Sequence, residues 1–193
     1  MLGLKLPTDP RWVNIAEKQL EEILTDHAYC EQKAATNGIT LIVKYADKER
    51  IVEEMTPLVA EEWGHFRKVV KELEKRGLKL GRQRKDEYVV KLQQHMYKGG
   101  SREQQLVEHL LVNALIEARS CERFRLLSMH MEDEYFKAFY HEFMVSEAGH
   151  YRMFIDLAKL HMPEEYVKMR WQQLLDAEAD ILQHIELRGD RIH

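Results

Sequence analysis

The sequence has few of the residues that interrupt helices. Only 9 glycines and 4 prolines occur among its 193 residues. Glu, Leu, Lys, Ala and Gln, which favour helix over other structure, are abundant. The composition therefore predicts a mostly helical protein, long enough to bury a sizeable core as one domain over residues 1–193.

Three further scarcities exclude whole classes of protein. The only cysteines are Cys30 and Cys121, with no Cys-x-x-Cys, which gives no support to a disulfide framework, a zinc ribbon or a rubredoxin-type iron site. No apolar run reaches the ~18 residues of a membrane span, and the apolar part of the N-terminus is too short for a secretory signal. A net charge of −4 means that the surface as a whole is not basic. Any contact with nucleic acid must therefore use a local group of basic residues. We expect a cytoplasmic protein without membrane association.

Apolar residues recur every three or four positions along most of the chain, which is the helical period. This period predicts two long hairpins, 9–76 and 102–160, joined by a crossover at 77–101 and followed by a C-terminal helix at 164–187. The expected helices are 9–45 with an irregularity at Asn37-Gly38, 48–76, a short stretch at 86–97, 102–130 and 135–160. Residues 188–193 are expected to be loose. Two helical hairpins with a long crossover are typical of an all-α, ferritin-like four-helix bundle.

Each hairpin carries one Glu-x-x-His motif, Glu62 to His65 and Glu147 to His150. Residues i and i+3 share a helix face, so each motif presents a carboxylate and an imidazole together. The motif alone is weak evidence, because chance placement of 24 Glu and 10 His in this chain gives about one such pair.

The spacing of these residues from the turns strengthens the signal. Glu31 and Glu62 lie equally far from the first predicted turn, and Glu117 and Glu147 lie equally far from the second. Each is about 15 residues, or roughly 23 Å along a helix, from its turn. Each hairpin should therefore hold two carboxylates and one imidazole at one level, on its apolar ridges.

Four buried carboxylates at one level would repel one another and would be costly to bury unless cations compensated them. Carboxylate oxygens with one neutral imidazole per ion suit iron or manganese better than zinc. The candidate metal ligands are Glu31, Glu62, His65, Glu117, Glu147 and His150. Glu122 is the alternative to Glu117, and His27 is either an outer partner of Glu31 or a core histidine.

Four stretches of the chain resemble the tRNA 2-methylthio-N6-isopentenyladenosine hydroxylases. They are Asp26–Ala35, Glu61–Phe66, Leu115–Phe124 and Ser146–Tyr151, in order and over nearly the whole chain, and 115–124 is the most specific of them. The chain departs from the expected pattern at Gly64 and Gly149, where a bulkier and often basic residue would precede each His.

The resemblance implies a non-haem di-iron monooxygenase, with two iron ions, or manganese in their place, bound by the six candidate ligands. It implies O2 as co-substrate, tRNA as substrate and partner, and an electron-donating reductase. The reaction would be hydroxylation of the isopentenyl group on the modified adenosine beside the anticodon. Phe66, Phe124, Leu127, Phe143 and Phe154 are candidate walls of the pocket.

Two alternatives stay open at this stage: a ferritin-like di-iron peroxidase or iron oxidase, and a metal-free helical interaction module. For a tRNA substrate, Arg82, Arg84 and Lys85 in the crossover are the candidate phosphate contacts. The sequence does not give the oligomeric state.

Overall fold

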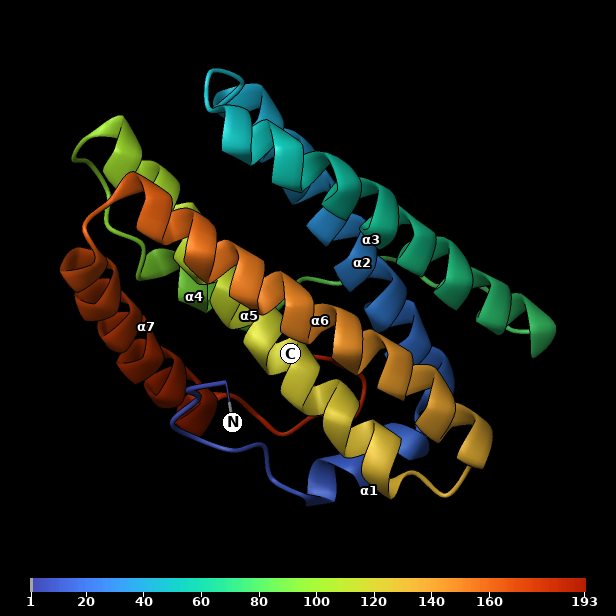
Figure 1. Ribbon diagram of the computed structural model, residues 1–193. Coiled ribbons are helices and arrows are strands. Elements are labelled where there is room, and N and C mark those ends of the chain that lie inside the picture. The colour runs from blue at the N-terminus through green and yellow to red at the C-terminus, as the bar shows by residue number, and fades with distance from the viewer. Residues whose placement is uncertain (1) are drawn as a thin grey trace. The chain divides into compact units, whose positions relative to one another are not determined.

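A computed structural model of the chain describes residues 2–193, and the elements within that range are helical (Figure 1). In chain order, the helices are α1 (Arg11–Glu17), α2 (Leu20–Lys44), α3 (Glu49–Lys75), α4 (Glu87–Gln94), α5 (Arg102–His130), α6 (Glu134–His161) and α7 (Glu164–His184). Among these described helices, none has the length and hydropathy needed to cross a membrane.

Contacts divide the chain into two compact units, and the division falls within α1. The α2–α3 unit comprises Asn14–Lys85 and Arg188–Ile192. The α5–α6 unit comprises the residues up to Val13, Asp86–Leu187 and His193. A single domain over 1–193 stays a prediction.

In the α2–α3 unit, the two long helices lie side by side as an antiparallel pair (Figure 1). Both predicted helix ends at their turn are confirmed to within one residue, since α2 ends at Lys44 and α3 begins at Glu49. Gly77, with a φ of 71°, follows α3 in the left-handed conformation that commonly ends helices.

The predicted irregularity at Asn37-Gly38 is wrong, because α2 is continuous there. Gly38 faces α3 so closely that a Cβ atom would lie 2.7 Å from Cγ2 of Val59. Its role is close packing of two helices rather than a bend. The helix predicted from residue 9 instead breaks at Lys18 and Gln19, between α1 and α2, where the sequence has no proline or glycine to signal a break.

The expectation of a loose C-terminal tail is also wrong. The backbone N–H of Ile192 donates to Oδ2 of Asp26 at 2.8 Å, and Ile192 is fully buried. Arg84 holds Asp190 of the tail through its carboxylate at 2.8 Å and its carbonyl oxygen at 2.9 Å. Residues 188–192 are therefore an integral part of the α2–α3 unit.

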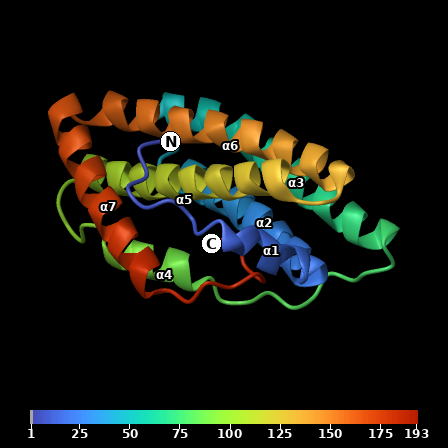
Figure 2. The same ribbon diagram turned by 90° about the horizontal axis from the view of Figure 1, so that it is seen from below.

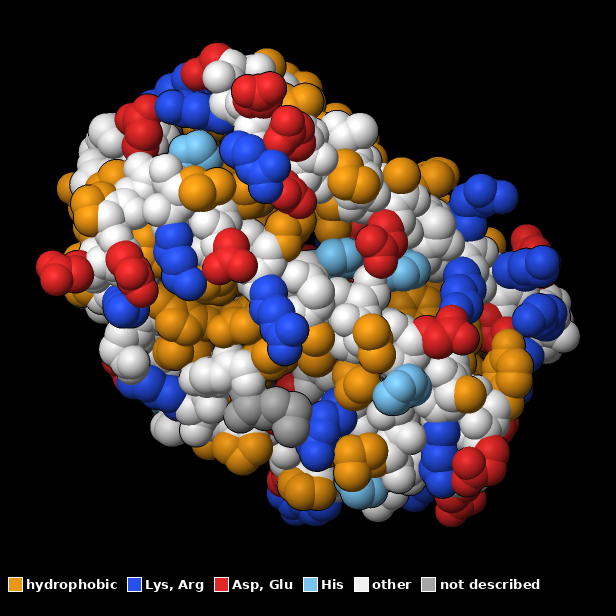
Figure 3. All heavy atoms as spheres, in the orientation of Figure 1, with side chains coloured by type: hydrophobic (Ala, Val, Ile, Leu, Met, Phe, Trp, Pro, Cys, Tyr) orange, Lys and Arg blue, Asp and Glu red, His pale blue; other side chains and the backbone are white. Residues whose placement is uncertain are grey.

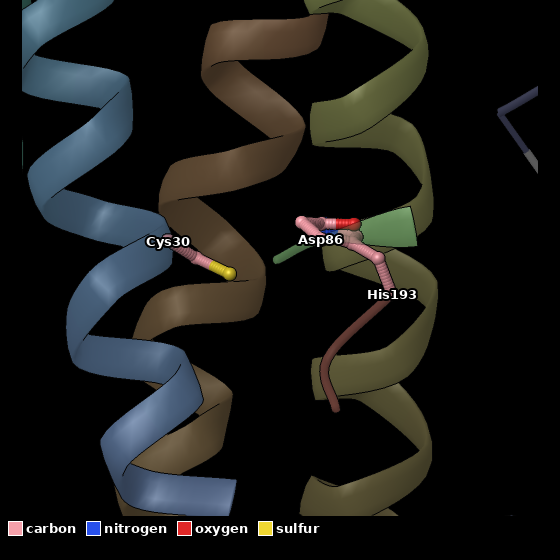
Figure 4. A group of neighbouring side chains, drawn as sticks. All are labelled: Cys30, Asp86 and His193. Atoms are coloured by element: carbon pink, nitrogen blue, oxygen red, sulfur yellow. The ribbon is translucent and has the colours of Figure 1, made fainter. Parts of the chain in front are cut away.

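In the α5–α6 unit, α5 and α6 form the second antiparallel pair, and α7 packs on α4 and α5 (Figure 2). Ser101 and Gln104 form a capping box at the start of α5. The last residue of this unit, His193, contacts Asp86 through Nδ1 and Oδ2 at 3.0 Å (Figure 4). Ser120 Oγ lies 2.8 Å from the other ring nitrogen of His193.

Candidate metal centre

The α2–α3 unit brings together Glu31, Glu62 and His65, here called the first ligand cluster. Nδ1 of His65 lies 3.3 Å from Oε2 of Glu31 and 3.6 Å from Oε2 of Glu62. Glu31 and Glu62 are 3% and 1% exposed, and the His65 side chain is 18% exposed. From their equal distance to the turn, Glu31 and Glu62 were predicted to lie at one level of the hairpin. The structure confirms this prediction, because His65 is close to both carboxylates.

Two neighbours orient the first ligand cluster. Nε2 of His27, one turn before Glu31 on α2, lies 2.7 Å from Oε1 of that carboxylate. Nε2 of His65 lies 3.9 Å from the exposed carboxylate of Glu61. His27 is therefore an outer partner of Glu31, and the imidazole of His65 presents Nδ1 to the two buried carboxylates.

The α5–α6 unit brings together Glu117, Glu147 and His150, here called the second ligand cluster. Each of these residues is at most 7% exposed, and their ligand atoms lie within 4.8 Å of one another. Nδ1 of His150 is 3.5 Å from Oε2 of Glu147, and Nε2 is 3.4 Å from the Ser146 hydroxyl. The imidazole again turns Nδ1 towards carboxylate and Nε2 towards an outer partner.

The donor sets of both clusters fit iron. Each offers two buried carboxylates and one imidazole, with no thiolate among the ligand atoms, which suits a hard or borderline divalent ion. An outer partner on the second ring nitrogen fixes the tautomer and direction of a ligating histidine. The second ligand cluster shows that arrangement at Ser146, whereas in the first ligand cluster the Glu61 carboxylate, at 3.9 Å from Nε2 of His65, lies beyond hydrogen-bond distance.

Aromatic rings of α5 and α6 pack together one to two helical turns from the residues of the second ligand cluster. Phe124 packs against Tyr140 and Phe143, with ring centroids 5.6 and 5.7 Å apart, and these side chains are almost fully buried. Burial, followed by the charges of Glu147 and Glu117, raises the pKa of the Cys121 thiol to about 12. Cys121 is thus a protonated core side chain at neutral pH.

The structure separates Glu117 from its alternative, Glu122. The carboxylate of Glu122 pairs with Arg119 and accepts hydrogen bonds from the Thr8 hydroxyl at 2.5 Å and the Thr8 backbone N–H at 2.9 Å. Glu122 is therefore held in another network, whereas Glu117 lies with Glu147 and His150.

Sequence reasoning missed the network around Arg119, although it lies in the most specific stretch, 115–124. The fully buried guanidinium of Arg119 donates to Oε1 of Glu178 on α7 at 2.6 and 2.9 Å. It also donates to the Leu6 carbonyl oxygen at 2.9 Å. Tyr88 adds a hydrogen bond to Glu178 at 3.3 Å.

The crossover residues predicted to contact tRNA differ in their surroundings. Arg82 and Lys85 are exposed. Arg84 is partly buried and is bonded to Asp190 and to the Glu22 carbonyl oxygen at 3.0 Å. The set stays a prediction for tRNA contact, but Arg84 also has a structural role in holding the tail.

Gly64 and Gly149, the residues before the two histidines, are not required by packing. A Cβ atom added at either position would meet nothing within 4 Å. Because glycine in a helix is about 1 kcal/mol less favourable than alanine, we expect Gly149→Ala to raise the free energy of unfolding by about that amount. Gly38→Ala is the matched control and should instead destabilise, because the stiff Val59 must move and overpacking costs about 1–3 kcal/mol. Urea denaturation of the metal-free proteins measures both, and a destabilised Gly149→Ala protein would contradict this reading.

Comparison with known proteins places the whole chain in one group. A family model described as tRNA-(MS[2]IO[6]A)-hydroxylase (MiaE) matches residues 2–193. The chain is 33% identical over 180 residues to the tRNA 2-(methylsulfanyl)-N(6)-isopentenyladenosine(37) hydroxylase of Pseudomonas putida, covering 93% of this chain and 86% of that protein. The hydroxylase of the same name from Salmonella typhimurium is 26% identical over 235 residues, covering 93% of this chain and 83% of that protein.

A solved structure shares the fold. It is named protein 43 with aldehyde deformylating oxygenase activity, from Synechococcus, and superposes with a TM-score of 0.92 at 33% identity, covering 98% of this chain and 94% of that one. The predicted all-α, ferritin-like fold is confirmed. The peroxidase, iron-oxidase and metal-free alternatives are not favoured by these comparisons.

Proposed function

The chain belongs to the tRNA-(MS[2]IO[6]A)-hydroxylase (MiaE) family, and from this premise we propose that it hydroxylates the isopentenyl group of 2-methylthio-N6-isopentenyladenosine in tRNA. The observation that carries the proposal is the family match over residues 2–193, in a chain that places a Glu-x-x-His pair beside a further buried carboxylate in each unit.

In this proposal the first and second ligand clusters supply the six ligands of a two-iron centre: Glu31, Glu62, His65, Glu117, Glu147 and His150. When bound, the iron pair would supply the activation of O2 for attack on an allylic C–H bond of the isopentenyl group, with electrons from a reductase. Nδ1 of His65 and Nδ1 of His150 are the candidate nitrogen ligands, because both face carboxylates.

The protein's own part is to hold these ligands and to keep water away. His27 orients the carboxylate of Glu31, and Ser146 orients the imidazole of His150. Phe124 and Phe143, whose buried rings pack together one to two helical turns from the second ligand cluster, are the candidate apolar walls. Exclusion of water protects a reactive centre from side reactions and suits a hydrocarbon substrate group. The modified base must leave its stack in the anticodon loop to reach such a site.

The test is a direct assay on three substrates. Protein reconstituted anaerobically with ferrous iron and supplied with a chemical reductant is mixed with O2 and tRNA carrying the methylthio-isopentenyl modification. Mass spectrometry of the digested tRNA should show one added oxygen atom in the modified nucleoside, and none in tRNA that lacks the isopentenyl group. A long-chain aldehyde and hydrogen peroxide are offered in parallel. Aldehyde loss without change in the tRNA would overturn the proposal in favour of the activity named for the Synechococcus protein.

A further inference from the structure

The C-terminal half of α3 carries a stacked pair of aromatic rings, of which Trp63 is exposed and Phe66 is half-buried. Trp63 and Phe66 lie one turn apart with ring centroids 4.8 Å apart and planes inclined by 28°. The Trp63 residue is 47% exposed although it lies beside the almost fully buried ligand candidate Glu62. The neighbouring Gly64 presents no side chain that could cover the indole ring. The structure therefore keeps a flat aromatic surface open to solvent.

Basic residues follow Trp63 along the same side of the helix. At about 100° per residue, the sector of α3 that begins at Trp63 contains Arg67, Lys71, Lys75 and Lys68, with Glu74 as its one acidic residue. All of these side chains belong to exposed residues. Figure 3 shows Lys and Arg side chains gathered over this end of α3, with acidic side chains among them. The sector combines an aromatic platform with an excess of positive charge.

Two of these cations are not engaged elsewhere. Within the described residues 2–193, no ion pair or hydrogen bond of the side chains of Arg67 and Lys71 occurs, whereas Lys75 pairs with Glu72 at 3.3 Å. Arg84 of the crossover, in contrast, is bonded to Asp190 and to a carbonyl oxygen. Arg67 and Lys71 can therefore bind an external anion without breaking an internal contact.

Another exposed aromatic residue shows what is specific to α3. Tyr135 at the start of α6 is 48% exposed and packs on Phe136 and Phe139, but the three residues before it in sequence are acidic. An exposed ring alone is an ordinary surface feature. The combination of a ring with unengaged cations at helical spacing is the arrangement by which proteins bind single-stranded nucleic acid, with bases stacked on the ring and phosphates on the cations.

We propose that the C-terminal half of α3 is a docking surface for single-stranded RNA, in which Trp63 stacks on a base of the anticodon loop and Arg67 and Lys71 contact the adjoining phosphates. The proposal rests on the proposed function for the choice of tRNA as the RNA. Trp63 lies about 100° around the helix from Glu62 and about 160° from His65. The base on Trp63 is therefore a neighbour of the reacting adenosine rather than that adenosine itself.

Tryptophan fluorescence tests the stacking directly. Trp12 is fully buried, so quenching by a bound base falls on Trp63 or on the half-buried Trp171. Titration with the modified tRNA should quench the emission, and the quenching should vanish in Trp63→Phe while most of the affinity remains. Trp63→Ala should weaken binding about fivefold or more, which is the lower end of the effect of removing one stacking platform. Tyr135→Ala is the matched control and should bind as the unaltered protein does.

The salt dependence of binding tests the phosphate contacts. Each contact with a single strand contributes about 0.7 to the slope of log affinity against log salt concentration. Arg67→Gln/Lys71→Gln should therefore reduce the slope by about 1.4, whereas Lys159→Gln/Lys168→Gln, which removes two exposed cations from α6 and α7, should leave it unchanged. The triple Ala variant of Arg82, Arg84 and Lys85 measures the crossover contribution in the same assay.

These outcomes separate the docking surface from the proposed function. Quenching at Trp63 and a reduced slope without hydroxylation would support the surface and overturn the function. Hydroxylation with unchanged affinity and unchanged KM in Trp63→Ala would overturn the surface and leave the function standing. Absence of tRNA binding by the unaltered protein would overturn the surface as well.

Discussion

Glu147→Ala protein is expected to retain less than one iron per chain after anaerobic reconstitution and to lose hydroxylation by at least about 100-fold. Even the loss of groups that only orient metal ligands costs roughly 10- to 100-fold in affinity or activity. Glu147 is 2% exposed and lies 3.5 Å from the Nδ1 atom of its partner His150, so its loss removes a carboxylate from the centre of the second ligand cluster.

A readout that does not depend on activity is the stabilisation of the fold by metal. A ligand at 100 times its dissociation constant stabilises the folded state by about 2.7 kcal/mol. Ferrous iron or manganese should therefore raise the melting temperature of the unaltered protein but not of Glu147→Ala. Glu142→Ala, at an exposed position of the same helix, is the control and should behave as the unaltered protein does. Two tightly held metal ions in Glu147→Ala would contradict the assignment.

The same measurement decides between the two glutamates of α5. Glu117→Ala should lose metal, because Glu117 lies with the second ligand cluster. Glu122→Ala should keep its metal and lose stability instead, because its carboxylate pairs with Arg119 and Thr8. The opposite pattern would make Glu122 the ligand.

Arg119→Met is expected to lower the free energy of unfolding by about 3–5 kcal/mol, the usual effect of removing one partner from a buried ion pair. Arg119 and Glu178 are both fully buried. Without the guanidinium, Glu178 and Glu122 lose their common cation and the Leu6 carbonyl oxygen loses a donor. Urea denaturation measures the loss.

The double variant Arg119→Met/Glu178→Met shows whether the charge or the packing is responsible. Replacing both members of a buried pair by apolar residues of similar volume is often close to neutral. We therefore expect the double variant to recover much of the stability lost in Arg119→Met. If the two losses add instead, packing of the arginine rather than the unpaired carboxylate accounts for the effect.

The loss in Arg119→Met should also depend on pH. Burial raises the pKa of the Glu178 carboxyl above its ordinary value of 4.5 despite the opposing charge of Arg119. Without Arg119, that pKa rises further, so the folded state binds a proton that the unfolded state has released. Stability then falls as pH rises above about 4.5. The deficit of the variant relative to the unaltered protein should thus be smallest near pH 4.5 and larger at neutral pH.

The ligand clusters were predictable because they depend on local periodicity and on distance from a turn. Glu31 and His65 meet at 3.3 Å because both hairpin arms are regular between them and the turn at 45–48. The outer partner of Glu31 was foreseeable for the same reason, since His27 is one helical turn away.

Features that depend on contacts distant in sequence were not predictable. The tail at 188–192 looks loose in sequence because it lacks helical periodicity, but Asp26 and Arg84 hold it from far away in the chain. From sequence, Gly38 predicts a break in the helix. In the structure it instead leaves room for Val59 of the facing helix. The break at Lys18 and Gln19 has no local signal, and nothing in the contacts of these two residues explains it.

The network around Arg119 also sets an order for folding during synthesis. Thr8 bonds to Glu122, which lies 114 positions later in the chain, and Arg119 bonds to Glu178, which lies 59 positions after Arg119. Contacts this distant in sequence form late, whereas the α2–α3 hairpin is closed by a short turn and can form as soon as both arms have been made. Arg119 of α5 therefore emerges from the ribosome as a charged group whose buried pair with Glu178 cannot form until α7 has been translated.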